Sequence, residues 1–168
     1  IGFGQLTENG ADTTLFWNRS FFNQFCPLVT DSETCGLGYA NMDEEQQVEL
    51  RRALVGSVNA SCEECPLGLD LTQADFSVDV FAHTLIANCE QTAQVIYNYT
   101  GSQTSEAASY EDLWKFTLVN YNAGGGCLAE GISGANGANG LPLTWETVSP
   151  HLIGACSSAV DYVNDISK

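Results

Sequence analysis

The stretch that decides the fold is LWKFTLVNYNAG, residues 113–124, which two further glycines follow. Its apolar residues recur at helical spacing, so it predicts a helix with one buried face. The triple glycine that begins at Gly124 predicts that this helix stops just after Tyr121 and Asn122. A helix that ends in this way places a phenol and an amide at the edge of a cleft. We therefore expect a functional site at this helix end.

The rest of the chain predicts helix after helix, with no strand alternation of useful length. Working outward from residues 113–124, we expect a single domain, 1–168, that is mainly α. The other expected helices cover 8–17, 20–26, 44–58, about 74–97 and 154–166. The helix that contains residues 113–124 opens at Ser109 with a capping-box pattern. We expect the glycine-rich segment 124–140 to be a mobile flap or connector.

Two of these helices carry explicit expectations about which side chains face the core. In the helix that Asp43 caps, the apolar residues leave Arg51 and Arg52 pointing outward. In the longest helix, five residues at helical spacing form the expected buried face: Phe81, Leu85, Cys89, Ala93 and Ile96.

The charge balance excludes two classes of partner. Five Lys and Arg residues stand against 21 Asp and Glu residues, a net charge of −16. Nucleic acid and anionic membrane surfaces would repel such a chain. No apolar run approaches the roughly 20 residues that a membrane span needs. No metal-ligand spacing or cofactor motif is present, so we expect neither a metal nor a cofactor.

Seven cysteines favour an oxidising compartment, extracellular or at the cell surface. Zinc binding or thiol chemistry at the CEEC motif, residues 62–65, is the less favoured alternative, because no second ligand pair follows. Of the many connectivities, we prefer three disulfides: Cys26–Cys35, Cys62–Cys65 and Cys127–Cys156. Cys89 is then either buried as a small apolar residue or bonded to an upstream piece. Three Asn-X-Ser/Thr sequons mark candidate glycosylation sites at Asn18, Asn59 and Asn98.

Three short motifs occur in a characteristic order: GFGQ at residues 2–5, YNAG at 121–124 and YV at 162–163. Together they resemble the lysozyme-like domain of soluble lytic transglycosylases, which cleave peptidoglycan, and the resemblance covers nearly the whole chain. It implies a lysozyme-like helical fold with disulfide-bonded loops. It also implies that Tyr121 and Tyr162 support the catalytic acid, while Gln5, Asn122 and Gly124 bind the glycan.

The chain departs from this family at its beginning. The family's single catalytic Glu precedes the GFGQ-like turn, so the resemblance implies an acid upstream of Ile1, in a segment lost by processing or truncation. Glu8 and Glu130 have no claim to that role. In this family the carboxylic acid protonates the leaving oxygen, and the muramic acid's own 6-hydroxyl closes a 1,6-anhydro ring. Neutral phenols suit such a site, because a nearby cation would lower the pKa of the acid.

Two hypotheses therefore remain open. The first is a peptidoglycan-binding domain related to lytic transglycosylases, which cleaves MurNAc–GlcNAc bonds when joined to its acid-bearing segment. Its partners would be glycan strands and a cleaved N-terminal segment or other cell-surface subunits. The second is a non-catalytic structural or adhesive protein of the cell surface that reuses the lysozyme-like fold. Whether this chain is itself an enzyme stays open.

Overall fold

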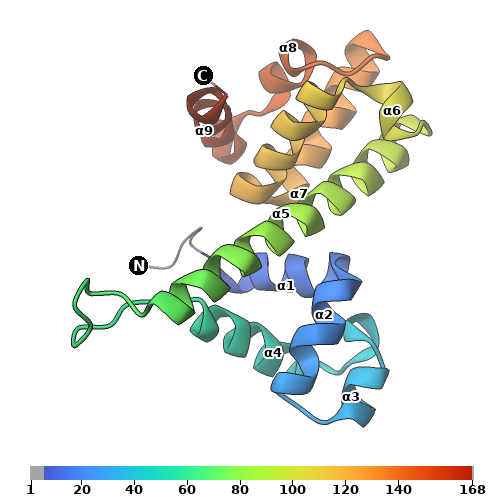
Figure 1. The fold of residues 1–168 in the computed structure, drawn as a ribbon. Coiled ribbons are helices and arrows are strands. Elements are labelled where there is room, and N and C mark those ends of the chain that lie inside the picture. Colours follow the sequence, from blue (N-terminus) through green and yellow to red (C-terminus); the bar gives the residue numbers. More distant parts are fainter. Residues whose placement is uncertain (1–5, 168) are drawn as a thin grey trace. The chain divides into compact units, whose positions relative to one another are not determined.

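The structure is a computed structural model that describes residues 6–167, and these are mainly helical, as predicted (Figure 1). The chain divides into two compact units, 1–87 and 88–168. The long helix α5 (Leu71–Thr100) contributes its first part to one unit and its second part to the other. Each unit has its own buried hydrophobic cluster. The expectation of a single domain stays a prediction.

The first unit is built from short, well-capped helices. Thr7 accepts a hydrogen bond from Gly10 N–H and so begins the first of them. Asp43 and Gln46 form a reciprocal capping box at the start of another. The elements before α5 are α1 (Glu8–Trp17), α2 (Arg19–Phe25), η1 (Cys26–Leu28), α3 (Ser32–Gly36), η2 (Tyr39–Asn41) and α4 (Glu44–Ser57). The expected bounds of α1 are therefore confirmed, and those of α4 lie within one residue.

Arg51 corrects the expectation that both arginines of α4 point outward. Its side chain is only 14% exposed, and Nη1 donates to Asp12 Oδ1 at 3.0 Å and to the hydroxyl of Tyr39 at 3.3 Å. Nη2 donates to Glu44 Oε1 at 3.0 Å. Arg52 is exposed, as predicted. The inward turn of Arg51 occurs because α1 and η2 supply a carboxylate and a phenol that compensate its desolvation.

The expected buried face of α5 is confirmed at Ile96, is wrong at Cys89, and is only partly met at Phe81, Leu85 and Ala93. Ile96 is buried, whereas Cys89 is exposed and the other three are half-buried. Small and hydroxyl-bearing residues form the buried face instead, because their side chains allow close packing and bond to neighbours. Ser77 Oγ donates to Val58 O at 2.6 Å, and Thr84 Oγ1 lies 2.9 Å from Thr14 Oγ1. The buried residues of α5 are Ser77, Val80, Thr84, Ala87, Asn88, Thr92 and Ile96.

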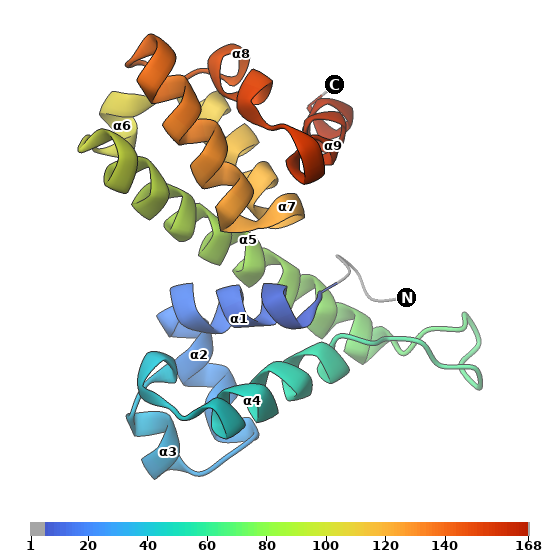
Figure 2. The ribbon, with the colours of Figure 1, turned by 180° about the vertical axis from the view of Figure 1, so that it is seen from behind.

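In the second unit, α7 (Tyr110–Asn139) is a helix in two halves. Gly124, at φ 87° and ψ 165°, interrupts its helical backbone, and Figures 1 and 2 both show the second half turning back alongside the first. The predicted stop at Gly124 is thus confirmed, but the predicted flap is wrong, since the chain is helical again to Asn139. The remaining elements are α6 (Thr104–Ala107), α8 (Trp145–Val148), η3 (Ser149–His151), η4 (Gly154–Cys156) and α9 (Ser158–Ile166).

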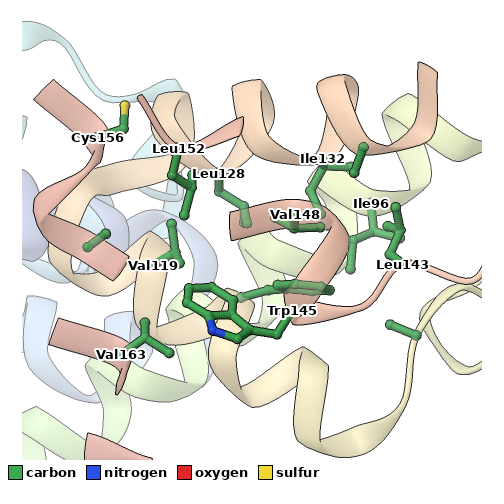
Figure 3. Close-up of a cluster of buried hydrophobic side chains, with 14 of the residues drawn as sticks. Ile96, Val119, Leu128, Ile132, Leu143, Trp145, Val148, Leu152, Cys156 and Val163 are labelled. Atoms are coloured by element: carbon green, nitrogen blue, oxygen red, sulfur yellow. The ribbon is translucent and has the colours of Figure 1, made fainter. Parts of the chain in front are cut away.

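Apolar residues explain why the glycine-rich half of α7 forms a helix. Leu128, Ile132 and Ala135 follow one another at helical spacing and are fully buried. Figure 3 shows the indole of Trp145 among the aliphatic side chains of this core. Its Nε1–H donates to Asn164 Oδ1 at 3.2 Å, which ties α8 to α9. In α9, Val163 is buried and Ile166 is exposed.

Three disulfides are present, Cys26–Cys35, Cys62–Cys65 and Cys127–Cys156, and they are the three expected pairs. The first two lie in the first unit and the third in the second unit. Cys89 is a free thiol and is exposed, so the alternative that it is buried is wrong, while a bond to an upstream piece stays a prediction. The residue falls on the outer side of α5, because the buried face runs through Asn88 and Thr92.

Candidate functional site

The candidate site forms around the interruption of α7 at Gly124. A φ of 87° lies in a region that residues with a Cβ rarely adopt, so glycine is required at this position. The next residue needs to be small for another reason. A Cβ added to Gly125 would lie 3.0 Å from Nε2 of Gln91 and 3.4 Å from Oδ1 of Asn120. The glycines therefore allow the chain to reverse close to α5.

The turn places Tyr121, three residues before Gly124, against α9. The rings of Tyr121 and Tyr162 stack with their centroids 6.4 Å apart and their planes at 27°. We call them the Tyr121–Tyr162 pair. Burial raises the pKa of both phenols, and the pKa of Tyr121 rises further because of the neighbouring Tyr162. Both side chains therefore stay neutral at physiological pH and can donate hydrogen bonds without adding charge.

Asn120 anchors this turn, and the site prediction did not include it. It is buried, and its Nδ2 donates to the backbone oxygen of Asn88 at 3.1 Å and to Gln91 Oε1 at 3.0 Å. These bonds fix the end of the first half of α7 to α5. In the sequence, only the tripeptide Asn120-Tyr121-Asn122 indicates this role. Helical periodicity does not tell which of its two Asn side chains is buried.

The other expected glycan-binding residues divide into two groups. Asn122 and Gly124 are exposed at the turn, one and three residues after Tyr121. Gln5 lies outside the described residues. The structure thus brings together the two tyrosines, whereas the proposed contribution of residues 2–5 stays a prediction.

The two carboxylates named in the sequence analysis lie on exposed surfaces. Glu8 is in the first turn of α1, where the helix dipole favours a negative charge, and it lies 3.8 Å from Nε of Arg52. Glu130 is on the second half of α7. Among residues 6–167, no group of three or more His, Cys, Asp and Glu side chains gathers as metal ligands would.

The three sequons differ in accessibility. Asn59 and Asn98 are exposed. Asn18 is only 6% exposed, because its side chain bonds to both α2 and α5: Oδ1 accepts from Phe21 N–H at 3.0 Å, and Nδ2 donates to the backbone oxygen of His83 at 3.2 Å. A glycan on that buried Nδ2 is incompatible with this fold, which corrects the expectation for Asn18.

Comparison with known protein families, curated proteins and solved structures found no match for this chain. None of the helices in residues 6–167 combines the length and the apolar character that a bilayer crossing demands.

Proposed function

We propose that this chain is a lytic-transglycosylase-like domain that binds the glycan strands of peptidoglycan outside the cell, with a lysozyme-like arrangement of its helices. One observation supports the proposal most strongly. Tyr121 and Tyr162, which the family resemblance singles out, lie on different helices and stack at 6.4 Å. Half-buried phenols beside an exposed amide are suited to sugars, which offer apolar ring faces and hydroxyl groups together.

The proposed chemistry needs an acid from a segment joined or docked to this chain. That carboxylic acid would give its proton to the glycosidic oxygen as the bond to the anomeric carbon breaks. The 6-hydroxyl oxygen of the same muramic acid then bonds to the anomeric carbon and gives its proton to the carboxylate that the first step left, which yields the 1,6-anhydro product. Tyr121 and Tyr162 would contribute neutral hydrogen-bond donors, since burial raises the pKa of both.

A sedimentation assay with purified insoluble peptidoglycan tests the binding step. We expect the wild-type chain to sediment with the polymer, and Tyr121→Ala or Tyr162→Ala to weaken retention roughly fivefold through lost ring contacts. Tyr110→Ala is the matched control, because it removes an exposed tyrosine from the same helix, α7. Equal retention of all four proteins would contradict the site, and no retention of the wild type would contradict the function.

Mass spectrometry of the soluble muropeptides separates the two hypotheses about activity. 1,6-anhydro products would support a lytic transglycosylase. Retention on peptidoglycan without such products, by this chain and by a longer chain that carries an upstream Glu, would favour the adhesive alternative.

A further inference from the structure

A pocket of about 580 Å³ lies in the second unit, on the half of α7 that follows Gly124. Gly126, Glu130 and Ser133 line it at intervals of four and three residues, so they share one helix face. The pocket is also lined by Ala129 of α7, by Tyr99 from the last turn of α5, and by His151 and Ile153, which follow α8. We call this the Glu130 pocket. Its volume falls within the usual range of small-molecule sites.

The walls of the pocket are held in place by close packing. A Cβ on Gly134 would lie 2.6 Å from Cγ and Nδ1 of His151, so the imidazole rests directly on the backbone of α7. The Cys127–Cys156 disulfide ties the same half of α7 to η4, next to Ile153. Gly126 has no atom within 4 Å of its Cβ position, which leaves space on that side of the helix.

The charge of the pocket selects the class of ligand. Glu130 is exposed and belongs to none of the ion pairs of residues 6–167. Besides His151, which lines the pocket, the described part of the second unit contains one basic residue, Lys115, whose Nζ donates to Glu111 Oε1 at 2.7 Å. With a net charge of −16 for the whole chain, the field at Glu130 attracts a cation and repels an anion.

The apolar rim adds a second requirement. Tyr99 and Ile153 are 46% and 68% exposed, respectively, and both line the pocket. An aliphatic stem can pack on these side chains, and the face of a tyrosine ring attracts an ammonium group. The combination fits a positively charged head on an apolar arm better than a compact inorganic ion.

We propose that the Glu130 pocket binds a primary ammonium group at the end of an aliphatic arm, supplied by the diamino acid side chain of a peptidoglycan stem peptide. The ammonium donates to the carboxylate of Glu130 while the arm contacts Tyr99 and Ile153. The choice of a stem peptide rests on the proposed function, whereas the ammonium chemistry rests on the pocket alone. Glycan and peptide are then bound by different residues of the same unit.

Calorimetric titration with the tripeptide L-Ala-γ-D-Glu-L-Lys, and with its Nε-acetylated form, tests the ammonium contact. We expect acetylation to weaken binding between about threefold and tenfold, the range for a partly exposed charged contact. Glu130→Gln, which keeps the size of the side chain, should remove the difference between the two peptides. Equal affinity of the wild type for both peptides, or no binding of either, would overturn the proposal.

Two glycine substitutions test the location. Gly126→Leu places a side chain in the pocket and should abolish binding of the tripeptide. Gly137→Leu is the matched control, because Gly137 is on the same helix half and has equally open surroundings. Unchanged affinity in Gly126→Leu would place the peptide elsewhere. Free 1,5-diaminopentane is the second probe. If it binds as tightly as the tripeptide, the pocket recognises only an alkylammonium group, and the proposal that a stem peptide supplies this group is overturned.

Peptide-free glycan strands separate this proposal from the proposed function. Glu130→Gln should sediment with them as the wild type does, while Tyr162→Ala should be retained less. If no protein is retained on bare glycan but the tripeptide still binds, the glycan function fails and the ammonium site stands. If glycan is retained and the tripeptide does not bind, the pocket proposal fails alone.

Discussion

At the scale of single residues, Tyr39 and Asp12 show how the first unit accommodates the half-buried Arg51. The hydroxyl of Tyr39 donates to Asp12 Oδ1 at 2.6 Å, and the same carboxylate oxygen accepts from Arg51 at 3.0 Å. Burial raises the pKa of Tyr39, and its hydrogen bond to Asp12 raises that pKa further. The phenol therefore remains a neutral donor inside a network that joins α1, η2 and α4.

This network predicts a loss of stability in alkali. An unfolded tyrosine ionises near its ordinary pKa of 10.0, whereas Tyr39 in the folded chain resists ionisation. Its contribution is therefore complete below pH 10 and is lost as the pH rises above that value. Tyr39→Phe should cost about 1 kcal/mol at pH 8, through the lost hydrogen bond. Above pH 10, the unfolding free energy of the variant should fall less steeply than that of the wild type.

Urea unfolding at a series of pH values measures both effects. Tyr110→Phe removes an exposed hydroxyl and should change the free energy of unfolding at pH 8 by less than about 0.5 kcal/mol. Identical slopes for wild type and Tyr39→Phe above pH 10 would show that Tyr39 does not drive the alkaline loss.

Single residues also show where sequence reasoning stops. The helical periodicity predicts that Arg51 points outward, but its partner Asp12 lies 39 residues away and draws the side chain inward. Asn120 is similar, because the partners of its amide lie on α5, 29 and 32 residues away. Contacts of this kind depend on tertiary packing, which no local pattern contains.

At the scale of elements, the helix starts at the capping residues Asp43 and Ser109 were predictable, whereas the glycine-rich helix was not. Asp43 and Ser109 each accept from a backbone N–H three residues ahead, and a short sequence window contains both partners. The segment 125–139 contains five glycines and has poor intrinsic helix propensity. It forms a helix because small residues allow close packing: a Cβ on Gly131 would lie 2.9 Å from Leu152 Cδ2.

The glycines of α7 should therefore respond differently to the same substitution. Gly124→Ala forces a Cβ onto a φ of 87° and should cost about 1–3 kcal/mol. Gly137→Ala, in helical backbone with open surroundings, should instead stabilise the protein by up to about 1 kcal/mol. Urea midpoints at constant slope measure both changes. A stabilising Gly124→Ala would contradict the turn geometry on which the candidate site depends.

At the scale of the whole molecule, the two units have separate hydrophobic clusters and separate disulfides. The site could be predicted from the sequence only in part. The tyrosines of the Tyr121–Tyr162 pair stand in motifs, so their importance was visible before their contact was. The Glu130 pocket has no motif, because its residues come from α5, α7 and the chain after α8, and only folding brings them together.

The distribution of the disulfides leads to a prediction about the second unit. Cys127 and Cys156 are 29 residues apart, so their bond restricts a long loop of the unfolded chain, and replacing both by Ser should cost about 3–4 kcal/mol. Cys62 and Cys65 are three residues apart, so the matched double replacement should cost about half as much or less. Both are measured as losses in the free energy of unfolding.

Hydrogen exchange then shows where each loss occurs. Without Cys127–Cys156, we expect amides of α7 and α9 to lose protection while those of α1 and α4 keep it, because the two hydrophobic clusters share no buried residue. The variant should also bind the L-Ala-γ-D-Glu-L-Lys tripeptide more weakly, since the bond holds α7 to η4 beside the Glu130 pocket. Equal loss of protection in α1, α4, α7 and α9 would instead mean that the two units unfold as one cooperative structure, with α5 transmitting the change.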